Sequence, residues 1–199
     1  MKKNNILLIG THNKGKFKEI SKLISKNIKK ISPIYFNIKA PKETGKTFKA
    51  NSELKAKYFY KQTKLISLSD DSGLEIFALN KKPGIYSARW ANSSGSFKKA
   101  MIKILDRLKN KKNRRARFIC SLSIKLNKKK TITSIGIING NISEKMLGAK
   151  GFGYDPIFIP DKSKLTFGQM PINRKMRMDH RSIAFKKLKK KLKFNKFFI

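Results

Sequence analysis

Apolar residues recur along the 199-residue chain at helical spacing in some stretches and as short continuous runs in others. Residues 6–10 form an apolar run that predicts a buried strand leading into a polar turn. Apolar positions three or four residues apart predict amphipathic helices over residues 17–29, 48–63 and 96–109. Residues 182–193 fit a terminal helix with its lysines facing outward.

Three further segments have the patterns of strands. Residues 65–69 form a short apolar run, and alternation predicts strands over residues 116–126 and 131–139. Asn139-Gly140 is typical of a hairpin turn. Mixed strands and helices without repeats or a long linker predict one α/β domain over residues 1–199.

The charge is strongly basic, with 49 Lys and Arg against 11 Asp and Glu and a net charge of +38. Lysine, isoleucine, asparagine and phenylalanine are the residues that AT-rich codons favour, and the lysines are spread along the whole chain. Compositional drift therefore explains much of the excess, and only non-specific nucleic-acid binding is expected. A selected polyanionic partner stays open as the alternative.

The cysteine count and the length of the apolar runs bear on the cellular compartment and on membrane contact. Cys120 is the single cysteine and cannot form an intrachain disulfide, which agrees with a reducing cytoplasm. No apolar run reaches about 18 residues, so we expect no transmembrane helix and no membrane partner.

The polar turn after the first strand carries a candidate phosphate site. Backbone amides next to a helix N-terminus suit an anion, and Lys14 and Lys16 add positive charge. The turn is not a P-loop, because the required spacing fails at Phe17. An ordinary polar turn remains the alternative. The candidate residues are Thr11, His12, Asn13, Lys14, Gly15 and Lys16.

Two adjacent carboxylates in so basic a chain predict a metal site. Asp70 and Asp71 follow the apolar run 65–69, and Glu43 offers a third carboxylate. Mg²⁺ takes one or two carboxylates together with waters and phosphates. A plain Asp-Asp-Ser-Gly turn at residues 70–73 stays open.

The segment 151–156, Gly-Phe-Gly-Tyr-Asp-Pro, is a candidate base-binding loop. Its glycines permit close backbone approach, and its aromatic rings can stack on a planar base. Lys175, His180 and Arg181 form a late polar cluster. A tight loop with core aromatics and a surface His-Arg pair are the plainer alternatives.

Taken in order, the motifs resemble the inosine triphosphate pyrophosphatase family, whose members act on non-standard purine nucleoside triphosphates. The likeness extends from residue 6 to about residue 190. The matching motifs are THNKGK at 11–16, ETGKTF at 43–48, DDSGL at 70–74, PGIYSAR at 83–89, GFGYDP at 151–156, Lys175 and His180-Arg181.

The resemblance implies an elongated mixed β-sheet with flanking helices and two lobes around a nucleotide-binding cleft. It implies a homodimer that hydrolyses ITP, dITP or XTP to the monophosphate and pyrophosphate with Mg²⁺. A basic nucleic-acid-binding protein on the same fold, and a pyrophosphatase of different base specificity, are the competing hypotheses.

Site roles carry over by position from the resemblance. Asp71 would be the catalytic base, and Glu43 and Asp71 would hold Mg²⁺. The phosphate and sugar path would be lined by residues 11–16, Lys55, Ser72 and Lys175. The base pocket would be formed by Phe152, Gly153, Tyr154, Asp155, His180 and Arg181.

Three positions depart from the family pattern. Asp179 replaces the usual serine before His-Arg, Gln169 replaces a glutamate, and Ala50 replaces the glutamate before Asn51. None of them removes a predicted metal ligand, so the departures bear on the base pocket more than on the reaction.

Overall fold

The computed structural model describes residues 5–192, and the chain divides into two compact units. Unit 1 comprises Met1–Asp71, Cys120–Gly136 and Arg181–Ile199; unit 2 comprises Ser72–Ile119 and Ile137–His180. Three long strands contribute residues to both units: β3 (Ser67–Ile76), β5 (Arg115–Lys125) and β6 (Thr131–Ile142).

The predicted α/β class is confirmed, with a mixed seven-stranded sheet of order β2-β1-β3-β5-β6-β7 and β4 paired to β3. In unit 1, β1 is parallel to both β2 and β3. In unit 2, β4 is antiparallel to β3, and β7 is antiparallel to β6. The remaining strands are β1 (Ile6–Ile9), β2 (Lys29–Ile31), β4 (Lys82–Pro83) and β7 (Phe158–Pro160).

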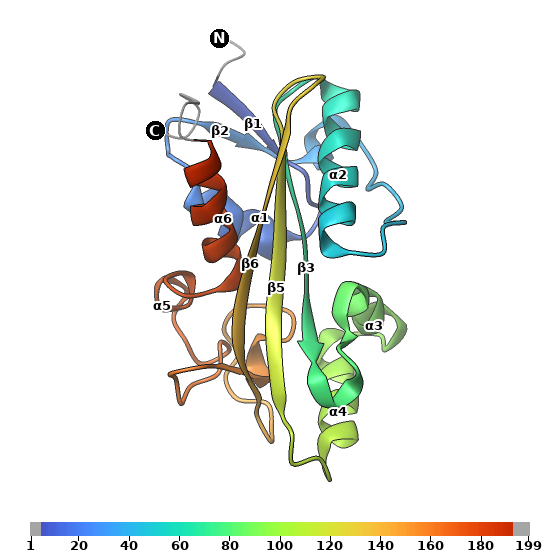
Figure 1. The fold of residues 1–199 in the computed structure, drawn as a ribbon, viewed down its shortest axis with the longest axis vertical. Helices are drawn as coiled ribbons and strands as arrows, with labels where there is room; N and C mark the ends of the chain where they lie inside the picture. The colour runs from blue at the N-terminus through green and yellow to red at the C-terminus, as the bar shows by residue number, and fades with distance from the viewer. Residues whose placement is uncertain (1–4, 193–199) are drawn as a thin grey trace. The chain divides into compact units, whose positions relative to one another are not determined.

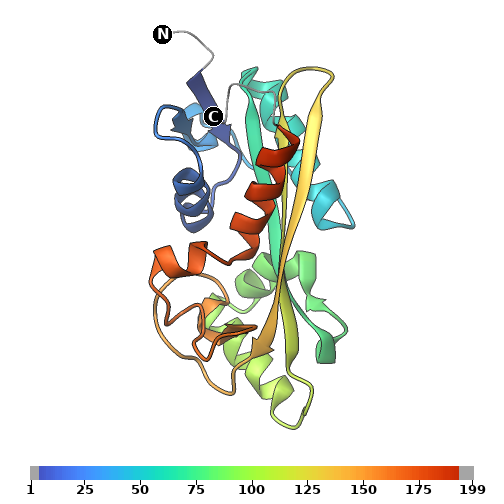
Figure 2. The same ribbon diagram turned by 60° about the vertical axis from the view of Figure 1, so that its left-hand side comes forward.

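Helices cover both faces of the unit 1 part of the sheet. Figures 1 and 2 show α6 along one face and α2 along the opposite face. The core under α1 and α6 includes Leu7 and Ile9, while the intervening Leu8 is also buried, as expected for a strand covered on both faces. The helices of unit 1 are α1 (Lys14–Leu23), η2 (Pro33–Phe36), α2 (Phe48–Thr63) and α6 (His180–Lys191). The first residue of α6, His180, belongs to unit 2, because the last segment of unit 1 begins at Arg181.

Unit 2 has its own core, in which Phe118, Phe158 and Phe167 pack ring against ring. α4 contributes the stripe predicted from its apolar spacing, with Met101 and Ile104 buried. The helices of this unit are η3 (Phe77–Leu79), η4 (Gly84–Tyr86), α3 (Ser87–Ser93), α4 (Phe97–Leu108), η5 (Asp155–Ile157) and α5 (Ile172–Met176).

Most predicted elements are confirmed, including the helix over 48–63, which the Thr47 side chain caps by accepting the Ala50 amide. The terminal helix also forms, and its described lysines lie outward; residue 193 is outside the described range. No helix within residues 5–192 is long and apolar enough to span a membrane.

The helix predicted over 17–29 is misplaced. It begins earlier, at Lys14, because Asn13 caps it, and it ends at Leu23. Ser25 then turns the chain by accepting the Asn27 amide, a local bond that competes with helix. Ile24 and Ile28 remain buried beyond the helix, so their spacing reflected core contact rather than helical periodicity.

The predicted hairpin turn at Asn139-Gly140 is wrong, and the turn left open at residues 70–73 does not form, because both segments are strand. Residues 70–73 lie inside β3, where a Cβ on Gly73 would meet the Gly84 carbonyl oxygen at 2.2 Å. Gly140 lies inside β6 opposite Pro160, and a Cβ there would meet the Ile159 carbonyl oxygen at 2.2 Å. Each glycine permits close backbone approach rather than a reversal of the chain.

Candidate active site

The predicted phosphate turn joins β1 to the N-terminus of α1. The Asn13 side chain accepts the Lys16 amide at 2.9 Å, and Thr11 Oγ1 accepts the Asn13 amide at 3.2 Å. The turn therefore presents the positive end of a helix together with exposed Lys14. His12 lies at its edge with Nε2 2.8 Å from the Ile38 carbonyl oxygen.

The structure brings Glu43, Lys55 and Asp71 together in unit 1. Lys55 Nζ donates to Glu43 Oε1 at 2.6 Å and lies 3.9 Å from Asp71 Oδ1. Lys55 comes from α2 and Asp71 from β3, so tertiary packing assembles the two carboxylates around one ammonium group.

Burial raises the pKa of the Asp71 carboxyl, and nearby Glu43 adds to this, while Lys55 and Lys16 oppose it. Burial acts to lower the pKa of Lys55, but Asp70, Asp71 and Glu43 outweigh it and raise that pKa. Lys55 thus stays protonated, and Asp71 binds a proton more readily than an exposed aspartate does.

A buried charge network lies beside these groups. Asp70 is fully buried; burial opposes its ionisation, but Lys16, Arg181 and Lys55 outweigh this and lower its pKa to about 2. Lys16 Nζ lies 3.0 Å from Asp70 Oδ2, and Arg181 donates to buried Glu19. The network ties the phosphate turn to β3, α1 and α6.

Sequence reasoning missed Asp70 and Glu19 as members of this network. The sequence marks Asp70 only as one of two adjacent carboxylates, and Glu19 belongs to none of the motifs. A usable signal existed, since Glu19 is the one acid in a helix with four lysines nearby.

Buried hydroxyl groups hold α2 in place. Ser52 Oγ lies 2.9 Å from Ser121 Oγ and 2.8 Å from Ser123 Oγ. Ser123 continues to Thr133 at 2.8 Å, and Thr133 donates to Glu53 at 2.8 Å. This series of hydrogen bonds fixes α2, the helix that supplies Lys55 to the site.

In unit 2, the predicted base loop is organised by one carboxylate. Asp155 Oδ2 accepts the Phe152 amide at 2.8 Å and the Lys175 ammonium at 2.6 Å, and Asp155 and Lys175 are both buried. The same ammonium lies 5.0 Å from the centre of the Phe152 ring. The structure therefore brings Phe152, Asp155 and Lys175 together.

The other predicted residues of unit 2 have structural contacts of their own. Tyr154 donates its hydroxyl to the Ser87 carbonyl at 2.9 Å, and burial raises the pKa of that phenol above its ordinary value. His180 stacks on Phe118 at 4.8 Å between ring centres. Ser72 lies on β3, directly after Asp71 in the chain and half-buried.

The family of this chain follows from its match to a model of a whole protein family. The Ham1 family model matches residues 7–191, nearly the entire chain. The chain belongs to the Ham1 family. Family membership implies a divalent metal cofactor.

Relatives support the Ham1 assignment. A "dITP/XTP pyrophosphatase" of Zymomonas mobilis is 38% identical over 186 residues, covering 92% of this chain and 89% of the relative. A Bacillus subtilis protein of the same name is 37% identical over 190 residues, covering 93% and 96%. The Staphylococcus aureus Ham1 protein structure has a TM-score of 0.84 at 34% identity, covering 96% of this chain and all of that one.

The donor set of this Ham1 chain fits a divalent cation. Within residues 5–192 no cluster of three or more Asp, Glu, His or Cys side chains could hold a metal, but Glu43 and Asp71 flank one ammonium group. Mg²⁺ usually takes one or two carboxylates, with waters and substrate phosphates as its other ligands. The Lys55 ammonium group, which lies near both carboxylates, shows that this site suits positive charge.

The three departures from the Ham1 pattern lie in different settings. Ala50 is exposed in the first turn of α2. The Gln169 side chain accepts the Thr166 amide at 3.0 Å. Asp179 is fully buried, directly before His180. Of the three, Asp179 alone places a buried carboxyl next to a predicted base-pocket residue.

Asn51 is a site residue that sequence reasoning missed. Its Nδ2 donates to Asp71 Oδ2 at 3.0 Å, and its Oδ1 accepts the Gly45 amide at 2.8 Å. One buried amide thus fixes both Asp71 and the segment that carries Glu43. A Cβ on Gly45 would lie 2.6 Å from Asn51 Oδ1, so the glycine is needed for this contact.

We expect Asn51→Leu to raise the metal concentration for half-maximal activity by roughly 10- to 100-fold, as for other residues that orient metal ligands. Leucine keeps the volume but donates nothing to Asp71. Metal titration of hydrolysis measures the shift, with exposed Asn92→Leu as the control. An unchanged metal requirement in folded protein would contradict this role for Asn51.

We expect Gly151→Ala to lower kcat/KM at least about tenfold by displacing the base loop. Gly151 has φ +76°, and a Cβ there would meet Asp155 Oδ2 at 2.0 Å. Gly95→Ala is the matched control, because Gly95 also has positive φ but only the Lys99 side chain nearby, at 3.8 Å. If both variants change the steady-state kinetics equally, strain at a positive φ explains the loss, and displacement of the base loop does not.

Proposed function

We propose that this Ham1-family chain hydrolyses ITP, dITP and XTP to the monophosphate and pyrophosphate with Mg²⁺. The observation that carries the proposal is the pair Glu43 and Asp71, whose carboxylate oxygens lie 2.6 and 3.9 Å from the Lys55 ammonium group. The relatives named dITP/XTP pyrophosphatase support the substrate class. The intact carboxylate pair favours an enzyme over a non-catalytic nucleic-acid-binding protein.

The residues of unit 1 supply the means for this reaction. The amides and lysines of residues 11–16 bind the phosphates, whose charge must be offset as the anhydride breaks. Asp71 takes a proton from the attacking water, and the bond between the α- and β-phosphates breaks to release pyrophosphate. Burial raises the pKa of Asp71, which makes it a better base than an exposed aspartate. Mg²⁺, when bound, neutralises phosphate charge and polarises the phosphoryl oxygens.

Base selection is proposed to rest on hydrogen-bond mismatch. A 6-oxo purine presents an acceptor where adenine presents an amino donor. Arg181 and backbone amides can only donate, so the amino group of adenine would face another donor. A site of this kind rejects the mismatched base strongly.

A substrate panel tests the proposal. ITP, XTP, dITP, GTP and ATP would be compared by pyrophosphate release, and we expect kcat/KM for ITP or XTP to exceed that for ATP by on the order of 10²-fold. Equal rates with ATP and ITP would refute the base pocket. No hydrolysis, together with nucleic-acid binding that persists at high salt, would favour the nucleic-acid-binding hypothesis.

We propose in addition that the enzyme is a homodimer, as the resemblance implies, and that it works in the cytoplasm, in agreement with its single cysteine. Sedimentation velocity at micromolar concentration measures the oligomeric state, and a single monomeric species would contradict it.

A further inference from the structure

A groove of about 510 Å³ lies between α1 and β2 in unit 1, outside the residues proposed for catalysis. Its volume falls in the range of ligand-binding pockets. We call it the α1–β2 groove. It is lined by Phe17, Lys18, Ser21, Lys22, Ile24, Lys26 and Lys30.

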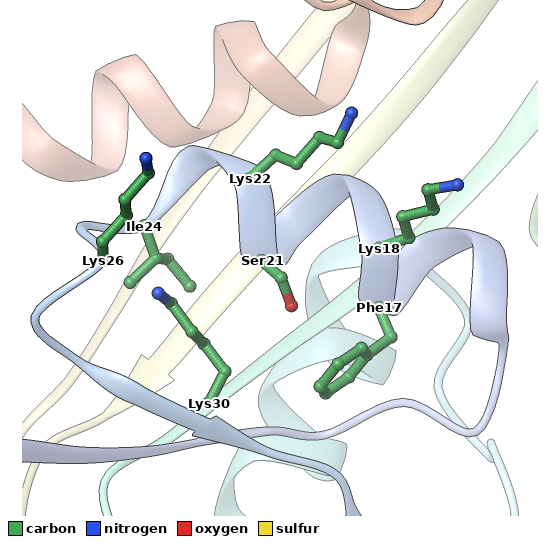
Figure 3. A pocket seen from close by; sticks show the side chains of 7 residues that line it. All are labelled: Phe17, Lys18, Ser21, Lys22, Ile24, Lys26 and Lys30. Carbon is green, nitrogen blue, oxygen red and sulfur yellow. The ribbon is translucent and has the colours of Figure 1, made fainter.

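The inner part of the groove combines apolar surface with one hydroxyl group. Figure 3 shows Phe17 and Ser21 pointing from α1 into the space beside β2, with Ile24 at the other end. Ser21 Oγ is buried and has no hydrogen-bond partner among the described residues. A flat apolar group that offers a polar edge would satisfy both features.

The outer part of the groove carries positive charge. Lys18, Lys22 and Lys26 extend outward in Figure 3, whereas Lys30 lies across the space and donates to the Ser25 carbonyl at 2.6 Å. The flexible lysine stems allow the ammonium groups to follow an extended anion across the rim.

No carboxylate among the described residues of unit 1 is available to these lysines. Each acid there already contacts another group: Glu19 with Arg181, Glu43 with Lys55, Glu53 with Thr133, Asp70 with Lys16, and Asp71 with Asn51. The positive charge of the rim is therefore left for an anion from solution.

We propose that the α1–β2 groove binds single-stranded nucleic acid, with a base between α1 and β2 and the phosphates on the outer lysines. Aromatic surface beside a basic track is the usual means of holding single strands. A duplex keeps its bases stacked inside and cannot fill the apolar part. Inorganic phosphate would leave that part empty. Binding here is localised, beyond the scattered non-specific contact that the net charge predicts.

Fluorescence anisotropy with a labelled dT20 oligonucleotide tests the proposal on the full chain. Changing Lys18, Lys22, Lys26 and Lys30 together to Gln should weaken dT20 binding at least about tenfold. It should also reduce the slope of log affinity against log salt by about 2 to 3, at roughly 0.7 per phosphate. Hydrolysis of ITP should change less than about twofold, since none of these lysines is proposed to touch substrate.

The matched control removes four other exposed helix-region lysines: Lys98, Lys99, Lys103 and Lys109 of α4 and its C-terminal end, each changed to Gln. It loses the same charge, and we expect less than about a threefold change in dT20 affinity. Equal losses in the two quadruple variants would overturn the proposal, because net charge alone would then govern binding.

Phe17→Leu separates base contact from charge. Leucine keeps apolar packing against the core, and loss of a stacked ring should weaken dT20 binding about fivefold or more. Affinity for a 20-base-pair duplex should be unchanged. Equal losses for single strand and duplex, or none for the single strand, would overturn the proposal. So would a groove variant that loses binding to anionic phosphatidylserine vesicles but keeps dT20 affinity.

Discussion

Replacing Asp71 with asparagine is expected to lower kcat by at least about 10²-fold, the low end for loss of a positioned acid–base group. Asparagine keeps the shape and can remain beside Asn51, but it cannot accept a proton from water. It is also a poor ligand for Mg²⁺. Steady-state pyrophosphate release from ITP at saturating metal measures the effect.

Exposed Asp106 of α4 supplies the control, because Asp106→Asn removes the same charge far along the chain from any proposed site residue. That variant should retain wild-type turnover. If Asp71→Asn folds, as judged by circular dichroism, and turns over at a near-wild-type rate, Asp71 is not the base. A loss seen only at low metal would instead restrict Asp71 to metal binding.

Arg181→Met is expected to destabilise the protein by about 3–5 kcal/mol, because it leaves buried carboxylates without their cation. Arg181 is buried, donates to Glu19 and lies 3.9 Å from Asp70 Oδ2. Methionine fills much of the space but carries no charge. Urea unfolding at neutral pH measures the free energy of unfolding.

Arg115 is the matched control, since it also pairs with a carboxylate, that of Asp161 at 2.7 Å, but on the surface. Arg115→Met should cost no more than about 1 kcal/mol. If Arg181→Met lowers the free energy of unfolding no more than Arg115→Met does, the buried network is not needed for stability. A stable Arg181 variant with a reduced preference for ITP over ATP would restrict Arg181 to its proposed role in reading the base.

Much of the secondary structure could be predicted from local sequence. The helix over 48–63 was predictable because the Thr47 cap and the apolar spacing are both local. The two glycine segments at 73 and 140 were not, since turn propensity and close backbone approach both favour glycine. Only the neighbouring carbonyl oxygens of Gly84 and Ile159 distinguish the two explanations.

The chemistry of the site also has a part that the sequence determines and a part that only the tertiary structure decides. The sequence by itself determined which groups are present, since carboxylates at Glu43 and Asp71 stand out in a chain with 11 acids and 49 Lys and Arg residues. Only the tertiary structure decided their partners: Lys55 near both carboxylates, and Asn51 as a donor to Asp71. Hydrogen bonds and Coulomb interactions act over a few ångströms of space, whatever the sequence separation, so residues 20 positions apart become partners only when α2 packs on β3.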